Sequence, residues 1–134
     1  MKLIEWKDSY GVGINIIDEQ HKKLFAWINE LYRAINENKD EEILGKTLEH
    51  LLDYVNFHFT TEEEYFEQFD YFQKSEHKDE HREYTEKIKN FIEERQNNKN
   101  FLSFEVLDFL EDWIISHVLA SDKKYVKCFH DHGL

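Results

Sequence analysis

Residues 44–62 read LGKTLEHLLDYVNFHFTTE, and this stretch decides the fold because its apolar side chains recur every three or four positions. Each residue of an α-helix advances by about 100° around the axis, so side chains at this spacing fall on one stripe. The stripe contains Leu44, Leu48, Leu51 and Val55. His58 and Glu62 lie on the same stripe. The stretch therefore predicts an amphipathic helix that buries an imidazole and a carboxylate with its leucines.

Three other stretches have the same spacing, which gives four expected helices, at about 18–37, 41–65, 74–96 and 103–119. The chain of 134 residues has no proline and only four glycines, a composition that favours helices over a sheet with many turns. We therefore expect an all-α protein with one domain over residues 1–134. Its predicted architecture is an antiparallel up-down-up-down four-helix bundle with an N-terminal arm and a short C-terminal helix or tail.

The charge balance excludes several classes of partner. The chain has 17 basic and 29 acidic residues, a formal net charge of −12, which disfavours nucleic acid and anionic membranes. No stretch has the pattern of a signal peptide or the length of a membrane span, so we expect a cytoplasmic protein, and a monomer. The single cysteine, Cys128, excludes an internal disulfide and is interpreted as an incidental thiol.

Five of the eight histidines fall on the apolar stripes of the expected helices, and all four helices contribute: His21, His58, His77, His81 and His117. One histidine on an apolar face is usually a hydrogen-bonded core residue. Five buried imidazoles are harder to supply with hydrogen-bond partners, whereas a metal ion uses the lone pairs of all of them. The remaining histidines, His50, His130 and His132, fall off the stripes or in the polar tail and are expected at the surface.

The carboxylates can be sorted by the same helical phase. Glu62 lies about 40° from His58, while Glu63 and Glu64 lie about 140° and 240° away, so only Glu62 points inward and the other two are interpreted as a solvated face. Asp122 follows His117 by five residues and would point about 140° away in a continuous helix. It can be a ligand only if the backbone turns near residues 120–121. Its alternative role is to cap a short helix that starts after it.

These side chains are too many for one metal ion. Five imidazoles and two carboxylates exceed a tetrahedral zinc site, and the lack of thiolates argues against an iron–sulfur cluster. Two metals are the natural count. Iron suits imidazole with carboxylate, although manganese or zinc could use the same ligands. If Glu62, Asp122 and a hydroxide bridge the two metals, three histidines fill one metal and two leave the other with an open position for a ligand such as dioxygen.

Several motifs together resemble the hemerythrin family, and specifically the single-domain bacteriohemerythrins. They are GVGINIIDEQHKKLF at 11–25, HFTTEE at 58–63, HKDEH at 77–81 and WIISHVLASDKKY at 113–125. The resemblance implies two iron ions with an oxo or hydroxo bridge. It assigns His77, His81 and His117 to the saturated iron and His21 and His58 to the iron that binds dioxygen. Glu62 and Asp122 are the bridging ligands.

The resemblance also implies a function. Dioxygen would bind reversibly in a dry apolar pocket formed by Leu24, Phe59, Trp113, Ile114 and Val118, in a carrier that is not an enzyme and that passes its oxygen to an oxygen-consuming enzyme. Two alternatives stay open. The first is a diiron redox enzyme, such as a ferroxidase, a peroxidase or a nitric-oxide-handling protein. The second is an oxygen sensor acting in trans, since 134 residues leave little room for a fused output domain.

Overall fold

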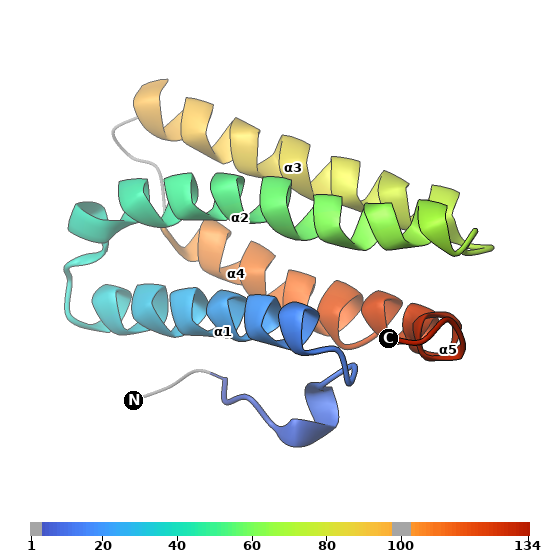
Figure 1. The fold of residues 1–134 in the computed structure, drawn as a ribbon. Helices are drawn as coiled ribbons and strands as arrows, with labels where there is room; N and C mark the ends of the chain where they lie inside the picture. Colours follow the sequence, from blue (N-terminus) through green and yellow to red (C-terminus); the bar gives the residue numbers. More distant parts are fainter. Residues whose placement is uncertain (1–3, 98–102) are drawn as a thin grey trace.

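The computed structural model describes residues 4–97 and 103–134, and all of the regular structure in these two segments is helical. The four long helices are α1 (Asn15–Asn36), α2 (Asp40–Gln68), α3 (Lys74–Asn97) and α4 (Ser103–Trp113). The shorter elements are η1 (Asp8–Tyr10), η2 (Ile114–Val118), η3 (Ser121–Tyr125) and α5 (Val126–Asp131). Helix α1 packs against α2 and α4, and α2 packs against α3 (Figure 1). The predicted four-helix bundle is confirmed, with boundaries that differ from the expected ones by a few residues for the first three helices.

The first two connections between helices use the same left-handed turn. Asn38 follows α1 with φ 56° and Asp70 follows α2 with φ 50°, a conformation that short polar residues tolerate better than most others. The next residue in each turn donates its N–H to a carbonyl five positions back, from Lys39 to Ala34 at 2.8 Å and from Tyr71 at 2.9 Å. These bonds satisfy carbonyls at the helix ends and reverse the chain within a few residues.

The core consists of two apolar clusters with a polar layer between them. The larger cluster fills the length of the bundle and includes Leu24 and Phe59. The smaller cluster lies at one end and comprises Val12, Ile14, Ile17, Phe66, Tyr71, Tyr125 and Phe129. His21 lies between Ile17 and Leu24 on α1, as Glu62 lies between Phe59 and Phe66 on α2. The histidines and carboxylates on the inner faces therefore form one layer that is enclosed by apolar side chains on both sides.

The fourth helix differs from its prediction, which placed a continuous helix over residues 103–119. Regular α-helix ends at Trp113, and η2 continues it as a π-helix in which the Leu119 N–H donates to the Ile114 carbonyl at 2.9 Å. Such wide turns are rare and are found most often at functional sites. Ala120 then leaves helical geometry, with φ −123° and ψ −72°, before η3 begins. The turn that Asp122 needs in order to face His117 is thus present.

The N-terminal arm lies along α1 (Figure 1). Its backbone at Ile4 exchanges two hydrogen bonds with the Asn29 side chain, at 3.0 and 2.7 Å. Trp6 packs its indole edge against Phe25, with ring centroids 5.3 Å apart. Farther along the arm, the Lys123 ammonium donates to two backbone carbonyls, which ties the arm to η3. The arm therefore covers the outer surface of α1 and joins it to the C-terminal segment.

The three histidines predicted to lie at the surface do so. His50, His130 and His132 are exposed, and Cys128 is a free, partly buried thiol. The His130 Nε2 lies 3.0 Å from the Val12 carbonyl at the surface. Within residues 4–97 and 103–134, none of the helices is long and apolar enough to cross a membrane.

Candidate metal centre

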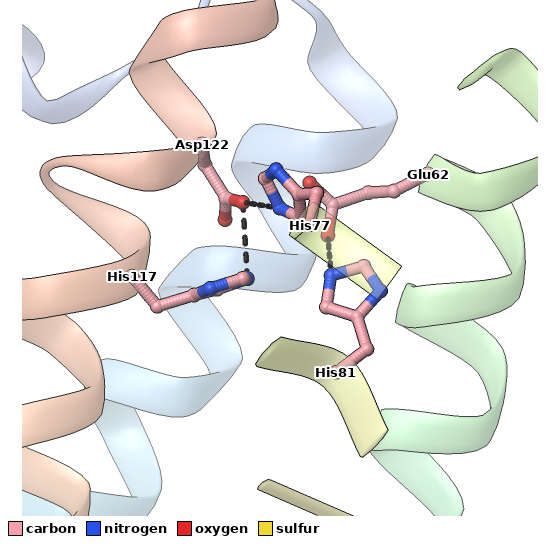
Figure 2. Close-up of side chains that lie close together, drawn as sticks. All are labelled: Glu62, His77, His81, His117 and Asp122. Atoms are coloured by element: carbon pink, nitrogen blue, oxygen red, sulfur yellow. Dashed lines mark hydrogen bonds and ion pairs between the residues drawn. The ribbon is translucent and has the colours of Figure 1, made fainter. Parts of the chain in front are cut away.

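The seven side chains predicted as metal ligands meet in the polar layer of the bundle. His21 comes from α1, His58 and Glu62 from α2, His77 and His81 from α3, His117 from η2 and Asp122 from η3. Each of them is at most 4 % exposed. Figure 2 shows five of these side chains, which point toward one another from three sides of the bundle.

Asp122 contacts histidines from three different elements. Its Oδ2 lies 2.9 Å from the Nε2 of His21, and its Oδ1 lies 2.8 Å from the Nε2 of His77 and 3.1 Å from that of His117. The π-turn and the break at Ala120 make these contacts possible, because a continuous α-helix would direct Asp122 about 140° away from His117.

Glu62 makes the corresponding contacts from the opposite side. Its Oε1 lies 3.0 Å from the Nε2 of His58 and 3.3 Å from that of His81. Both carboxylates are completely buried, and no lysine or arginine of the described segments forms an ion pair with either of them. Two buried negative charges without a lysine or arginine have to be balanced by protonated histidines or by a bound cation.

The donor atoms divide into two groups that share both carboxylates. One group consists of Glu62, His77, His81, His117 and Asp122, and the other consists of His21, His58, Glu62 and Asp122. Within each group the potential ligand atoms lie within 4.8 Å of one another. An arrangement of three histidines beside two, with two carboxylates common to both, has the form of a site for two bridged metal ions.

The orientation of these atoms fits metal ions better than it fits hydrogen bonds. Although they lie about 3 Å apart, most have no hydrogen-bond partner in the part of the chain that the structure describes. The unpaired atoms are the Nε2 of His21, His58, His81 and His117, both oxygens of Glu62 and the Oδ2 of Asp122. Buried polar atoms are nearly always hydrogen-bonded. Their convergence without pairing is expected when each one is directed toward a cation, and five imidazoles with two carboxylates suit iron.

Three outer side chains orient the imidazoles. The Nδ1 of His117 lies 3.0 Å from Glu80, the Nδ1 of His58 lies 2.5 Å from the Gln20 amide oxygen, and the Nδ1 of His81 lies 3.3 Å from Glu63. Since a carboxylate or amide oxygen accepts, each Nδ1 donates its proton, and Nε2 is the nitrogen that would ligate a metal ion once it carries no proton. This is the tautomer that metal ligation at Nε2 requires.

The contact of Glu63 corrects one prediction. Glu63 was expected on a solvated face together with Glu64, but its side chain is only 33 % exposed and lies against His81. Helical phase places Glu63 away from the leucine stripe of α2, and that part is correct. It does not reveal that α3 packs beside this neighbouring face and brings His81 to it. Glu64 is exposed, as predicted.

Burial and neighbouring charges shift the pKa values of two histidines of the centre in opposite directions. Burial lowers the pKa of His58, which favours its neutral form with a free lone pair. His117 has the opposite shift. Burial opposes its charge, but the negative charge of Asp122 at 3.1 Å and the hydrogen bond to Glu80 raise its pKa to about 10. Without a metal ion, His117 therefore holds a proton that a cation has to displace.

The five residues that the resemblance assigns to a ligand pocket are all in the larger apolar cluster, and each is at most 4 % exposed: Leu24, Phe59, Trp113, Ile114 and Val118. Phe59 stacks on His81 with ring centroids 3.8 Å apart and lies 5.6 Å from the Trp113 ring. These side chains cover the histidine layer with apolar surface and leave little access for water.

Sequence reasoning missed Gln20 and Glu80 as partners of the histidines. Glu80 follows His77 by three residues, which puts the two about 60° apart on α3, so this spacing could have indicated it. Gln20 directly precedes His21 and carries no such signal. It contacts the ring of His58 on α2, and only the packing of α1 against α2 brings the two together.

Comparisons with known proteins identify relatives of this chain. The model of the hemerythrin HHE cation binding domain matches residues 12–129. A bacteriohemerythrin of Clostridium acetobutylicum is 36 % identical over 126 residues, covering 90 % of this chain and 97 % of the relative. A hemerythrin-like protein of Naegleria gruberi is 33 % identical over 120 residues, covering 90 % and 88 %. The crystal structure of wild-type hemerythrin superposes with a TM-score of 0.83 at 28 % identity, covering 94 % and 97 %. The crystal structure of a leucine-to-alanine mutant of hemerythrin superposes with a TM-score of 0.85 at 29 % identity, covering 96 % of this chain and 98 % of the mutant.

Proposed function

The chain belongs to the hemerythrin family, and on this premise we propose that it binds dioxygen reversibly at a non-haem diiron centre. His77, His81 and His117 would hold one iron, and His21 and His58 the other. Glu62 and Asp122 would bridge them, together with an oxo or hydroxo group. When bound, two ferrous ions would supply an open coordination position for dioxygen and the electrons that its reversible binding requires.

The observation that carries the proposal is the division of the donor atoms into unequal groups that share two buried carboxylates. Three histidines with two carboxylates and a bridge would fill six positions at one iron. Two histidines with the same carboxylates and bridge would fill five at the other, which would leave a place for a ligand on that side. Each carboxylate contacts at least one histidine of each group, as a bridging ligand must.

The surroundings favour a carrier over an enzyme. The dioxygen pocket would be lined by five buried apolar side chains: Leu24, Phe59, Trp113, Ile114 and Val118. They would exclude water and external protons, which would otherwise protonate the bound ligand and release it. The outer partners of the histidines fix their tautomer and would keep their lone pairs directed at the metals. An oxygen-consuming enzyme would then be the recipient of the oxygen that the carrier releases.

Repeated oxygenation tests the proposal. The purified protein is loaded with iron, reduced without air, exposed to oxygen and deoxygenated through several cycles while the visible absorption is followed. A charge-transfer band that appears and disappears in every cycle supports the carrier. Conversion of the protein to a stable oxidised form in the first cycle would contradict it, and catalytic oxidation of added ferrous iron or consumption of peroxide would favour a redox enzyme.

Two histidines of α2 provide a matched pair of variants for the same assay. His58→Ala removes a buried group of the centre, whereas His50→Ala removes an exposed imidazole that only stacks on Trp27. The first variant should lose the oxygen-dependent band and one of the two irons. The second should behave like the unmodified protein in every cycle.

A further inference from the structure

Tyr54 is a buried tyrosine beside the centre to which the proposed function gives no role. It lies on α2 one turn before His58, and its ring stacks on that of His58 with centroids 5.1 Å apart and 17° between the planes. The Trp113 ring lies 6.3 Å away, and the Trp27 ring meets Tyr54 edge-on at 5.3 Å. With 6 % exposure, Tyr54 is enclosed by aromatic rings from α1, α2 and α4.

The hydroxyl of Tyr54 has no hydrogen-bond partner in residues 4–97 and 103–134, although it is buried. The indole N–H of Trp113 is unpaired in the same way. Buried hydroxyls nearly always have a partner, because an unpaired one forfeits its hydrogen bond to water without compensation. Two unpaired donors on neighbouring rings therefore require an explanation, and a small ligand that accepts a hydrogen bond from one of them supplies it.

A tyrosine hydroxyl carries a proton that it can donate in a hydrogen bond. The Tyr54 hydroxyl is itself buried, and its ring is packed against the rings of His58 and Trp113. A partner for this proton therefore has to lie inside the bundle.

Tyr54 lies next to the group of two histidines. Its stacking partner His58 has its ring 4.8 Å from that of His21, so Tyr54 adjoins the group of two histidines. The other fully buried phenol near the centre, Tyr125, instead contacts the ring of His77 in the group of three. Through His58, the Tyr54 position adjoins the metal site at which the count of donors would leave an open place.

We propose that the Tyr54 hydroxyl is a ligand-binding group of the pocket and donates a hydrogen bond to the small ligand held beside His58. The chemical class of ligand is a molecule of two or three atoms that carries negative charge on its outer atom. This inference rests on the proposed function, because it needs the pocket next to His21 and His58 to be the ligand site. It adds a polar group to a pocket that the family resemblance describes as wholly apolar, and it predicts preference for ligands that accept a hydrogen bond.

Azide is a suitable probe because it is a small anion and binds without turnover. The iron-loaded, oxidised protein is titrated with azide, and its affinity is read from visible absorption and its environment from the azide stretching band. Tyr54→Phe removes only the hydroxyl and keeps the ring stacked on His58. A hydrogen bond to a charged acceptor corresponds to a loss of about tenfold to hundredfold in azide affinity. The stretching band should shift, and its sensitivity to heavy water should disappear.

Tyr84→Phe is the matched control, since Tyr84 stacks on the same Trp113 indole at 4.9 Å but is only partly buried. It should leave azide affinity within twofold of the unmodified protein. Unchanged affinity and an unchanged band in Tyr54→Phe would overturn the inference, as would equal losses in both variants. A failure of azide to bind to the unmodified protein would overturn it as well.

The two proposals fail in different ways. If oxygen binds reversibly but Tyr54→Phe leaves azide binding unchanged, the carrier function is supported and the role of Tyr54 is refuted. If Tyr54→Phe weakens azide binding while oxygen oxidises the reduced protein irreversibly in the first cycle, the role of Tyr54 is supported and the carrier function is refuted.

Discussion

Replacing the consecutive glutamates 62, 63 and 64 of α2 by glutamine, one at a time, should give a large loss of metal affinity, a smaller loss and no loss, in that order. The substitution keeps the size of the side chain and removes its negative charge. The three positions differ in depth: Glu62 is completely buried, Glu63 is 33 % exposed beside His81, and Glu64 is exposed. Since the three residues are consecutive and of one type, only their surroundings can produce different results.

The magnitudes follow from the contacts. Glu62 contacts one histidine of each ligand group, at 3.0 and 3.3 Å, so in the proposed diiron centre its loss would remove a ligand from both metals. Losing an outer partner of a ligand typically costs tenfold to a hundredfold in metal affinity, and a shared ligand should cost more than about a hundredfold. Glu63 contacts His81 at a long 3.3 Å and is partly solvated, so about tenfold is expected. Glu64→Gln should be unchanged.

The assay is competition between each protein and a chelator for ferrous iron without air, with iron per chain counted after equilibration. Circular dichroism at the same pH checks that each variant stays helical. Equal losses in Glu62→Gln and Glu64→Gln would refute the assignment of Glu62 to the centre. Affinity of Glu63→Gln equal to that of the unmodified protein would refute only its role as a partner of His81.

Three other expectations concern the same core. Glu80→Gln should weaken metal binding about tenfold, because Glu80 accepts hydrogen bonds from His117 and Ser121 at 3.0 Å each; a chelator competition with no change would contradict this. Metal affinity should rise with pH between 6.5 and 8.5, since the pKa of His117 is raised to about 10 in the metal-free protein and metal binding must release that proton. The expected slope is about tenfold in affinity per pH unit for one proton. An affinity that does not change with pH would exclude proton release from His117. Leu48→Ala should lower the free energy of unfolding by about 2–5 kcal/mol in a denaturant titration, because Leu48 is 1 % exposed in the large apolar cluster, and iron per chain should stay unchanged.

The helical period of the sequence was sufficient to find six of the seven side chains of the centre, whereas Asp122 is out of phase with His117 in a continuous helix. Because an α-helix turns by a fixed angle per residue, the position of His58 relative to its leucines determines that it faces the core, without knowledge of any other helix. The same reasoning places His21 and Glu62 inward and His50 outward, and the structure agrees at each of these positions. Helix content and the direction of the apolar faces are local properties, so they can be read from one segment at a time.

Tertiary structure alone decided how these side chains are grouped and what surrounds them. The contacts that join Asp122 to His21, His77 and His117 depend on a π-turn and a backbone break whose geometry no local pattern specifies. Glu63 lies against His81 because α3 packs beside that face of α2, and Tyr54 stacks on His58 among rings supplied by other helices. Local sequence fixes the angle of a side chain around its own helix axis. Which atoms it meets depends on the position of the neighbouring helices, and that is set by the packing of the whole core.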